Sequence, residues 1–395
     1  MASENGVNRT GLIAAASACM FVFGTVLLLM GSLLPSLQVS NVQAGNLGSV
    51  PLSGILMATI LVGPILDKAG GRFVLVTGLA LIVVSLALLS ILHRYPELIG
   101  AAFAYGLGGG LLNTATNALV SEISASRRLA ALNLLGLFFS LGAIVAPLMM
   151  SSIGGSLPPS VVLRFLSAVT AMVMIPILVL RFPPPTQAGT RIVNLLSVLT
   201  NPVVWVFGAL LFFESGSENC MFVWSSKVVA QVSRTSPQQA NVALVGLSSA
   251  LGAGRLMAVL WLRWLGSRYT LWLSSATVVV GALIASTSRE FAPMTASMVV
   301  IGLGLSAVFP TALGLAGDRF PAETGTVFGA IMTVALVGGT VGPSLAARLA
   351  ASGPTKVLWV PIGSAAAIAT LTAIATRRKH ELTANSSESG IGPDA

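Results

Sequence analysis

The chain has 395 residues, of which 55% are hydrophobic and only 8% are charged. A soluble domain has about 25% charged residues, so this composition excludes a soluble globular protein. The formal net charge of +9 is not gathered into a basic patch with interleaved aromatic residues, so it indicates membrane topology and contact with anionic lipid, and not nucleic acid.

Apolar segments long enough to cross a bilayer recur along the whole chain. A span needs about 20 mostly apolar residues, because no water in the bilayer can satisfy a bare backbone. We predict twelve spans, with ten or eleven as the alternative because the first and seventh grade into polar stretches. In chain order they cover residues 11–35, 46–66, 73–92, 97–120, 130–152, 160–181, 200–222, 238–262, 269–287, 292–316, 325–348 and 356–376.

The two halves of the chain repeat each other at a constant spacing of about half its length. Gly70 recurs as Gly266, and Gly142 recurs as Gly338. The offset holds without a gap from about residue 70 to about residue 147, which argues for twelve spans. Two parallel six-helix halves with a solute site between them are the architecture of many secondary transporters.

The distribution of Lys and Arg predicts the orientation. With the N-terminus inside, about twice as many basic residues fall on the cytoplasmic side as outside, so we expect both termini in the cytoplasm and a multi-pass protein of the cell (inner) membrane. The organisation that follows is a six-helix bundle in 1–181, a cytoplasmic linker in 182–198, a second six-helix bundle in 199–376 and a disordered polar tail in 377–395.

No residue set for enzyme chemistry occurs in the sequence. It has no Ser/His/Asp combination, no phosphate-binding loop and no cluster of metal ligands, so we expect no enzyme activity, no cofactor and no metal. Cys19 and Cys220 both lie in apolar segments and are interpreted as small packing residues, not as a disulfide.

The loop between the second and third spans carries a recognisable motif. It reads Gly63-Pro-Ile-Leu-Asp67-Lys68-Ala-Gly70-Gly71-Arg72 and resembles the G-x-x-x-D-(R/K)-x-G-(R/K)-(R/K) signature of the major facilitator superfamily. We expect Gly63 to let a neighbouring helix approach and Asp67 to cap a helix end and pair with a cation. The predicted cytoplasmic gate comprises Gly63, Asp67, Lys68, Gly70, Arg72, Glu122 and Asp318.

A narrower resemblance covers nearly the whole chain. The fourth and fifth spans (Gly106 to Pro147), Gly216, Glu218 and Trp224 in the seventh span, and the tenth span from Gly302 are similar to the fucose permease-like branch, which carries hexose–proton symporters. Those symporters typically carry an acid in the first or fourth span, whereas this chain has none there. If the protein is proton-coupled, the proton must therefore be carried by Glu214 or Glu218.

Glu214 and Glu218 are the acids that lie well inside a predicted span. An ionisable group in the membrane is costly unless it is paired or neutralised, so it is a functional candidate. The two lie one helical turn apart. Removal from water and the negative charge of the neighbouring glutamate both favour a protonated carboxyl group. The alternative for Glu218 is that it ends the helix in outside water.

Arg255 lies inside the eighth span, roughly 10 Å closer to the cytoplasm than Glu214 by the helical rise per residue. Because of this difference in depth, the sequence does not decide whether Arg255 forms an ion pair with Glu214 or Glu218. Arg255 either binds the solute or pairs with Asp318 at the inner gate.

Amide and aromatic side chains are the remaining candidates for solute binding. Asn113 and Asn117 share one face of the fourth span, where amides suit sugar hydroxyls but equally suit an interhelical hydrogen bond. The predicted solute-binding residues are Asn113, Asn117, Asn133, Asn219, Trp224, Arg255 and Phe309.

The sequence therefore predicts an all-α membrane protein of twelve transmembrane helices in two pseudo-symmetric bundles. We expect a monomer that moves a small polar solute by alternating access. A sugar is the leading candidate for the solute, and protons are the expected coupling ion. Efflux of an amphipathic compound is the alternative within transport. A non-transporting membrane sensor or scaffold with the same fold is the alternative from another class.

Overall fold

The computed structural model describes residues 8–124, 128–152, 157–183, 200–320 and 324–388. This part of the chain contains helices and no strand. The first half forms α1 (Arg9–Leu33), α2 (Asn41–Leu89), α3 (Tyr95–Ile123), α4 (Arg128–Ser152) and α5 (Pro159–Val179). The second half forms α7 (Pro202–Ser233), α8 (Pro237–Thr287), α9 (Phe291–Ser306), α10 (Val308–Arg319), α11 (Thr324–Ala350) and α12 (Trp359–Glu388).

Two of these helices each contain two spans, joined by a turn at a glycine. Gly70 in α2 has φ 78° and ψ 163°, and Gly266 in α8 has φ 71° and ψ 162°. This backbone region is open almost only to glycine. The repeat seen in the sequence therefore reappears as the same turn at the matching position of each half.

The described residues contain the twelve predicted spans. Ten segments are long and apolar enough to cross a membrane, and among them α2 counts once although it contains two spans. Helix α7, which carries Glu214, Glu218 and Lys227, is the further span. Helices α9 and α10 together form one span that breaks at Ala307, because Pro310 has no N–H to bond the carbonyl one turn earlier.

The repeat extends beyond the stretch that the sequence indicates. Ser40 caps α2 by accepting from the Gln43 N–H, and at the matching position Ser236 caps α8 by accepting from the Gln239 N–H. Helix contacts repeat as well. A methyl group at Gly106 would collide with the Pro51 carbonyl, and one at Gly302 would collide with the Leu247 carbonyl.

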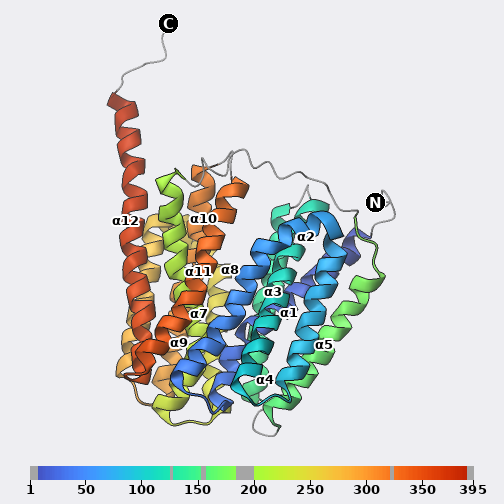
Figure 1. Ribbon diagram of the computed structural model, residues 1–395. Helices are drawn as coiled ribbons and strands as arrows, with labels where there is room; N and C mark the ends of the chain where they lie inside the picture. The colour runs from blue at the N-terminus through green and yellow to red at the C-terminus, as the bar shows by residue number, and fades with distance from the viewer. Residues whose placement is uncertain (1–7, 125–127, 153–156, 184–199, 321–323, 389–395) are drawn as a thin grey trace.

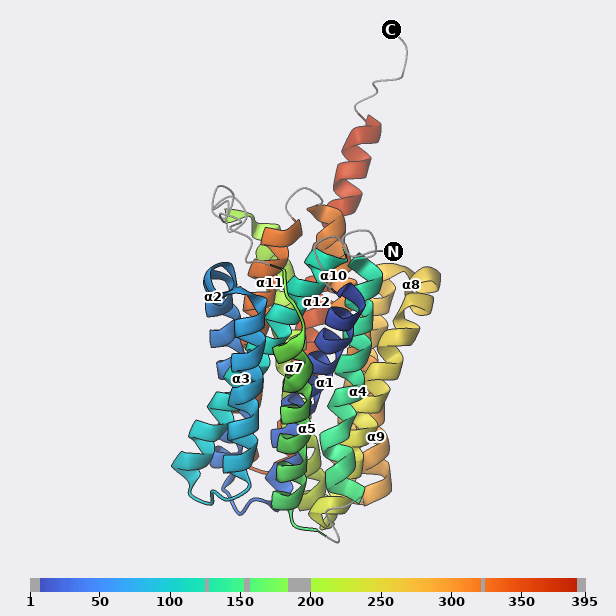
Figure 2. The same cartoon turned by 90° about the vertical axis from the view of Figure 1, so that its right-hand side faces the viewer.

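The helices form two bundles, α1 to α5 and α7 to α12, which stand side by side in Figure 1. They meet along α2 with α11 and along α4 with α8; the second seam is visible in Figure 2. Following the predicted orientation, we call the end that carries residues 34–40, 234–236 and 351–358 the outer end and the opposite end the cytoplasmic end.

Hydrogen bonds between described residues join the two bundles at the outer end. Side chains or backbone groups of residues 32–49 in the first bundle pair with residues 227–241 and 344–350 in the second. The pairs are Asn41 with Ala350, Lys227 with Val39, Gln231 with Asn41, Asn241 with Ser32, and Ser344 with Ser49. Backbones also touch here, since a methyl group at Gly31 would collide with the Phe222 carbonyl. The outer end of the molecule is closed.

Most span edges agree with the prediction to within a few residues, and the seventh does not. Helix α7 continues to Ser233, whereas the sequence placed its end at residue 222. Ser226 and Lys227 have hydrogen-bond partners inside the protein, so these polar residues do not mark an exit from the membrane. Helix α12 likewise continues to Glu388, past the predicted end at 376. The predicted linker lies almost entirely outside the described residues.

Replacing Gly266 with alanine tests the glycine turn. No atom lies within 4 Å of an added methyl group, so any penalty comes from the backbone conformation alone. We expect Gly266→Ala to destabilise the protein by about 1–3 kcal/mol, measured as a lower thermal midpoint of tryptophan fluorescence in detergent. The control, Gly314→Ala, lies in open space on helical backbone and should leave the midpoint unchanged or raise it. Equal midpoints for both variants would show that the turn is not strained.

Candidate functional site

Two acids lie buried near the middle of α7. Glu214 is 1% exposed and Glu218 is 8% exposed, one helical turn apart on the same helix. The helix continues past Glu218 for several more turns and ends at Ser233. The alternative in which Glu218 ends its helix in outside water is therefore wrong, because α7 is longer than its hydropathy indicates.

Arg255 of α8 forms an ion pair with Glu218. Its Nη2 lies 2.8 Å from Oε2 and 3.1 Å from Oε1 of the carboxylate. The outer end of α7 is at Ser233 and that of α8 is at Pro237, so the two partners lie at similar distances along their helices and at nearly the same depth. The greater length of α7 explains why the sequence placed Arg255 deeper. The pair joins α7 to α8 within the second bundle.

Glu214 lies next to this pair and interacts electrostatically with both of its members, Glu218 and Arg255. Among the described residues its buried Oε1 has no hydrogen-bond partner. A carboxylate in this position would be a second negative charge beside a single guanidinium, and an unpaired buried charge costs several kcal/mol. A proton on Glu214 removes that cost.

The predicted amides form two local pairs. Asn117 on α3 donates from Nδ2 to the Asn113 carbonyl (2.8 Å) and to its side-chain oxygen (3.1 Å). Asn219 on α7 donates to the Ser215 carbonyl (2.9 Å) and hydroxyl (3.3 Å). All three amides are half-buried, and each bond uses only part of the amide hydrogen-bonding capacity. Asn133 lies outside the described side chains.

The two predicted aromatic residues differ in their surroundings. Trp224 is fully buried, and its ring N–H donates to the Pro343 carbonyl at 3.1 Å, so in this conformation it packs α7 against α11. Phe309 is half-buried in the first turn of α10, beside the break at Ala307. Of the two, only Phe309 retains partly uncovered ring surface.

Several gate residues meet at the cytoplasmic end of the first bundle. Asp67, Gly70 and Glu122 line a cavity of about 150 Å³ together with Phe182. The Arg72 guanidinium donates to the Leu178 carbonyl, which fastens the glycine turn to α5. Among the other predicted gate residues, Lys68 is exposed on α2, and Asp318 is exposed near the end of α10 in the other bundle.

The expectation that Gly63 permits a close helix contact is wrong in this conformation. No atom lies within 4 Å of a methyl group built there. Gly63 shares an uncovered face of α2 with Ile60 and Asp67, toward the cytoplasmic end. The close contacts between the bundles are at the opposite end, so none of the described helices lies against this face.

Sequence reasoning missed a set of polar residues at the outer end. Lys227 is 4% exposed and donates from Nζ to the Val39 carbonyl at 3.1 Å. Asn241 accepts from the Ser226 hydroxyl and donates to the Ser32 carbonyl. We call Lys227, Gln231 and Asn241, with their partners in residues 32–41, the outer latch. The helical continuation of α7 through Ser225-Ser226-Lys227 was the signal that could have revealed it.

The sequence matches a known protein family over most of its length. The model of the Major Facilitator Superfamily matches residues 12–343 of the chain. The chain belongs to this superfamily. The family assignment also confirms that the protein is a transporter and not an enzyme.

The relatives of this major facilitator include two uncharacterized transporters. One, y4wD of Sinorhizobium fredii (strain NBRC 101917 / NGR234), is 24% identical over 88% of this chain and 86% of its own. The other, the MFS-type transporter YPO1221/y2967 of Yersinia pestis, is 24% identical over 85% of this chain and 84% of its own. Their names support transport and leave the solute open.

Solved structures of similar fold include two transporters with named solutes. The nucleoside transporter NupG has a TM-score of 0.76 at 12% identity, over 93% of this chain and 98% of its own. A D-xylose–proton symporter has a TM-score of 0.74 at 14% identity, over 93% and 97%. At these identities the likeness shows the fold alone.

Breaking the ion pair tests whether it stabilises this major facilitator. Arg255→Gln leaves the Glu218 carboxylate without its partner, so we expect a loss of about 2–3 kcal/mol in stability. The double variant Arg255→Gln/Glu218→Gln should recover most of that loss, because the uncompensated charge is gone. Thermal unfolding in detergent measures both. Additive losses in the double variant would contradict a direct energetic coupling.

Proposed function

We propose that this transporter moves a small polar solute of the sugar class together with protons, by alternating access of the two bundles. The observation that supports proton coupling is the position of Glu214, buried near the middle of α7 beside an existing ion pair and with one carboxyl oxygen unpartnered. A side chain that must shed its charge to remain buried is suited to carry a proton.

The proposed coupling works through competition for Arg255. With Glu214 protonated, Arg255 pairs with Glu218 alone and α7 is held to α8. When Glu214 releases its proton, two carboxylates share one guanidinium, and the redistribution of hydrogen bonds changes the contact between α7 and α8. Protonation thereby biases the equilibrium between two arrangements of the bundles.

The solute would bind between the bundles through amides. Asn113 and Asn117 supply acceptors and donors from α3, and Asn219 supplies them from α7 in the other bundle. Amide groups match the paired donors and acceptors of sugar hydroxyls. A D-xylose–proton symporter has a similar fold. This likeness is compatible with a sugar as the solute and protons as the coupling ion, but it assigns neither to this chain.

The closed outer end gives the starting point of the cycle. For the outer end to open, the outer latch must break, beginning with the bond from Lys227 to the Val39 carbonyl. The uncovered face of α2 around Gly63 and Asp67 would then be available to α11 as the cytoplasmic ends approach. The predicted gate motif would act in that second conformation.

Uptake into proteoliposomes tests the proposal. We expect an inward proton gradient to drive accumulation of at least one member of a panel of hexoses, pentoses and sugar acids. Glu214→Gln should abolish accumulation while leaving solute exchange intact, because it removes the proton carrier and preserves the shape of the side chain. The matched control, Glu290→Gln, changes an exposed acid at the start of α9 and should accumulate like the wild type.

Two outcomes would overturn the proposal in different ways. Accumulation that survives in Glu214→Gln would remove this residue from the coupling while leaving transport in place. Uptake of no sugar by folded, correctly inserted protein would remove the sugar class and favour efflux of an amphipathic compound.

A further inference from the structure

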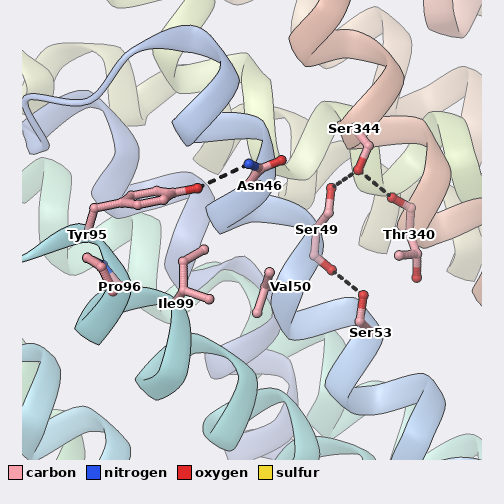
Figure 3. A pocket seen from close by; sticks show the side chains of 9 residues that line it. All are labelled: Asn46, Ser49, Val50, Ser53, Tyr95, Pro96, Ile99, Thr340 and Ser344. Carbon is pink, nitrogen blue, oxygen red and sulfur yellow. Dashed lines mark hydrogen bonds between the residues drawn. The ribbon is translucent and has the colours of Figure 1, made fainter.

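A groove opens on the side of the molecule where the two bundles meet. Figure 3 shows it between α2, the beginning of α3, and α11. It is a shallow, open groove with a volume of about 550 Å³. We call it the lateral groove. The residues that line it are Asn46, Ser49, Val50, Ser53, Tyr95, Pro96, Ile99, Thr340 and Ser344.

The lining combines apolar surface with unused hydrogen-bond donors. Asn46 donates to the Tyr95 hydroxyl at 3.1 Å, which leaves the other amide hydrogen and the hydroxyl hydrogen of Tyr95 available (Figure 3). Ser344 bonds Ser49 at 2.7 Å across the seam between the bundles. The groove therefore presents donors to a ligand that is rich in acceptor oxygens.

Exposed apolar side chains border the lateral groove. Large apolar side chains that flank it on α2 and α11 are exposed, as expected for a surface that faces lipid chains. Val42 is 53% and Met57 is 46% exposed on α2, and Leu345 is 46% exposed on α11. Lipid acyl chains are the partner that such an apolar border suits.

Two exposed arginines lie close in sequence to lining residues, on the side of the outer end. Arg94 directly precedes Tyr95 and is exposed at the start of α3. Arg348 is exposed one helical turn beyond Ser344 on α11. Glu97, in the first turn of α3, is the opposing charge in this region. Two guanidinium groups against one carboxylate favour a ligand with a single negative charge.

We propose that the lateral groove binds one anionic glycerophospholipid. Its phosphate lies toward Arg94 and Arg348, its glycerol ester oxygens accept from Tyr95 and Asn46, and an acyl chain runs along Val50 and Ile99. This combination matches each part of the lipid to the chemistry of the groove. The site is distinct from the acid pair in α7 and does not depend on the proposed solute.

The position of the groove across the seam gives the lipid a role in the transport cycle. Ser49 belongs to the first bundle and Ser344 to the second, so the groove is complete only while the outer ends are together. A ligand that binds one conformation better shifts the equilibrium toward it. The bound lipid therefore stabilises the outward-closed conformation.

Native mass spectrometry of the full chain, titrated with dioleoylphosphatidylglycerol and with dioleoylphosphatidylcholine, tests the site. We expect the first molecule of phosphatidylglycerol to bind more tightly than further phosphatidylglycerol molecules and than phosphatidylcholine. Tyr95→Phe should weaken it about fivefold through the loss of one hydrogen bond. Arg348→Gln should remove the preference for the anionic lipid. Unchanged thermal midpoints will show that both variants are folded.

Two matched controls separate a site from general lipid contact. Tyr269→Phe changes a tyrosine that is 61% exposed at the opposite end, and Arg289→Gln changes an exposed arginine in the loop before α9. Both should bind the lipid like the wild type. A diazirine-bearing phosphatidylglycerol should label the outer half of α11 and the beginning of α3.

Three results would overturn the proposal. One is equal binding in all variants, and another is labelling spread evenly over α5, α9 and α12. The third is displacement of the lipid by the transported solute, which would make the groove a solute site. Because binding is read without transport, failure here would leave the proposal for Glu214 untouched.

Discussion

The pairing of Arg255 with Glu218 is the interaction around which the second bundle is organised. A charge inside the membrane is tolerated only with a partner, and here one guanidinium serves a helix that carries two acids. This imbalance defines the site: one acid is paired and the other, Glu214, is buried beside the pair with an unpartnered oxygen. The ion pair links α7 to α8, so in the proposed mechanism a change in the protonation of Glu214 alters the contact between these two helices.

The rest of the molecule positions this site through repetition and close contact. Matching glycine turns at Gly70 and Gly266 give each bundle the same fold, and the glycines of α3 and α9 let backbones touch in the same pattern. The bundles are then joined at the outer end by hydrogen bonds of mostly neutral groups, with Lys227 as the buried cation. Neutral bonds of this kind can be exchanged for water at modest cost, which suits a contact that must open in every cycle. The lateral groove lies on the same seam, so the lipid that we propose there would stabilise the same closed state.

The sequence predicted the architecture well because the constraint behind it is simple. Apolar length fixes the spans and the internal repeat fixes their number, and both appear in the structure down to the caps at Ser40 and Ser236. The prediction failed where polar residues do not mark the point at which a helix leaves the membrane. Helix α7 looked as if it ended near residue 222 because Glu218, Asn219 and Lys227 are polar, yet each is held by a partner inside the protein. That single misplacement shifted the apparent depth of Glu218 and concealed its pairing with Arg255. The uncovered Gly63 could not be foreseen either, because the motif does not indicate which conformation the chain adopts.

We propose that Glu214 is a neutral, protonated acid in the outward-closed state. Difference infrared spectroscopy on protein in liposomes tests it most directly, because a protonated carboxyl group has a carbonyl stretch that a carboxylate lacks. The account predicts such a band in the wild type and in Glu290→Gln, its loss in Glu214→Gln, and a change in its intensity when a transported solute is added. A wild-type spectrum with no protonated-carboxyl band assignable to Glu214, under conditions in which the protein transports, would contradict it.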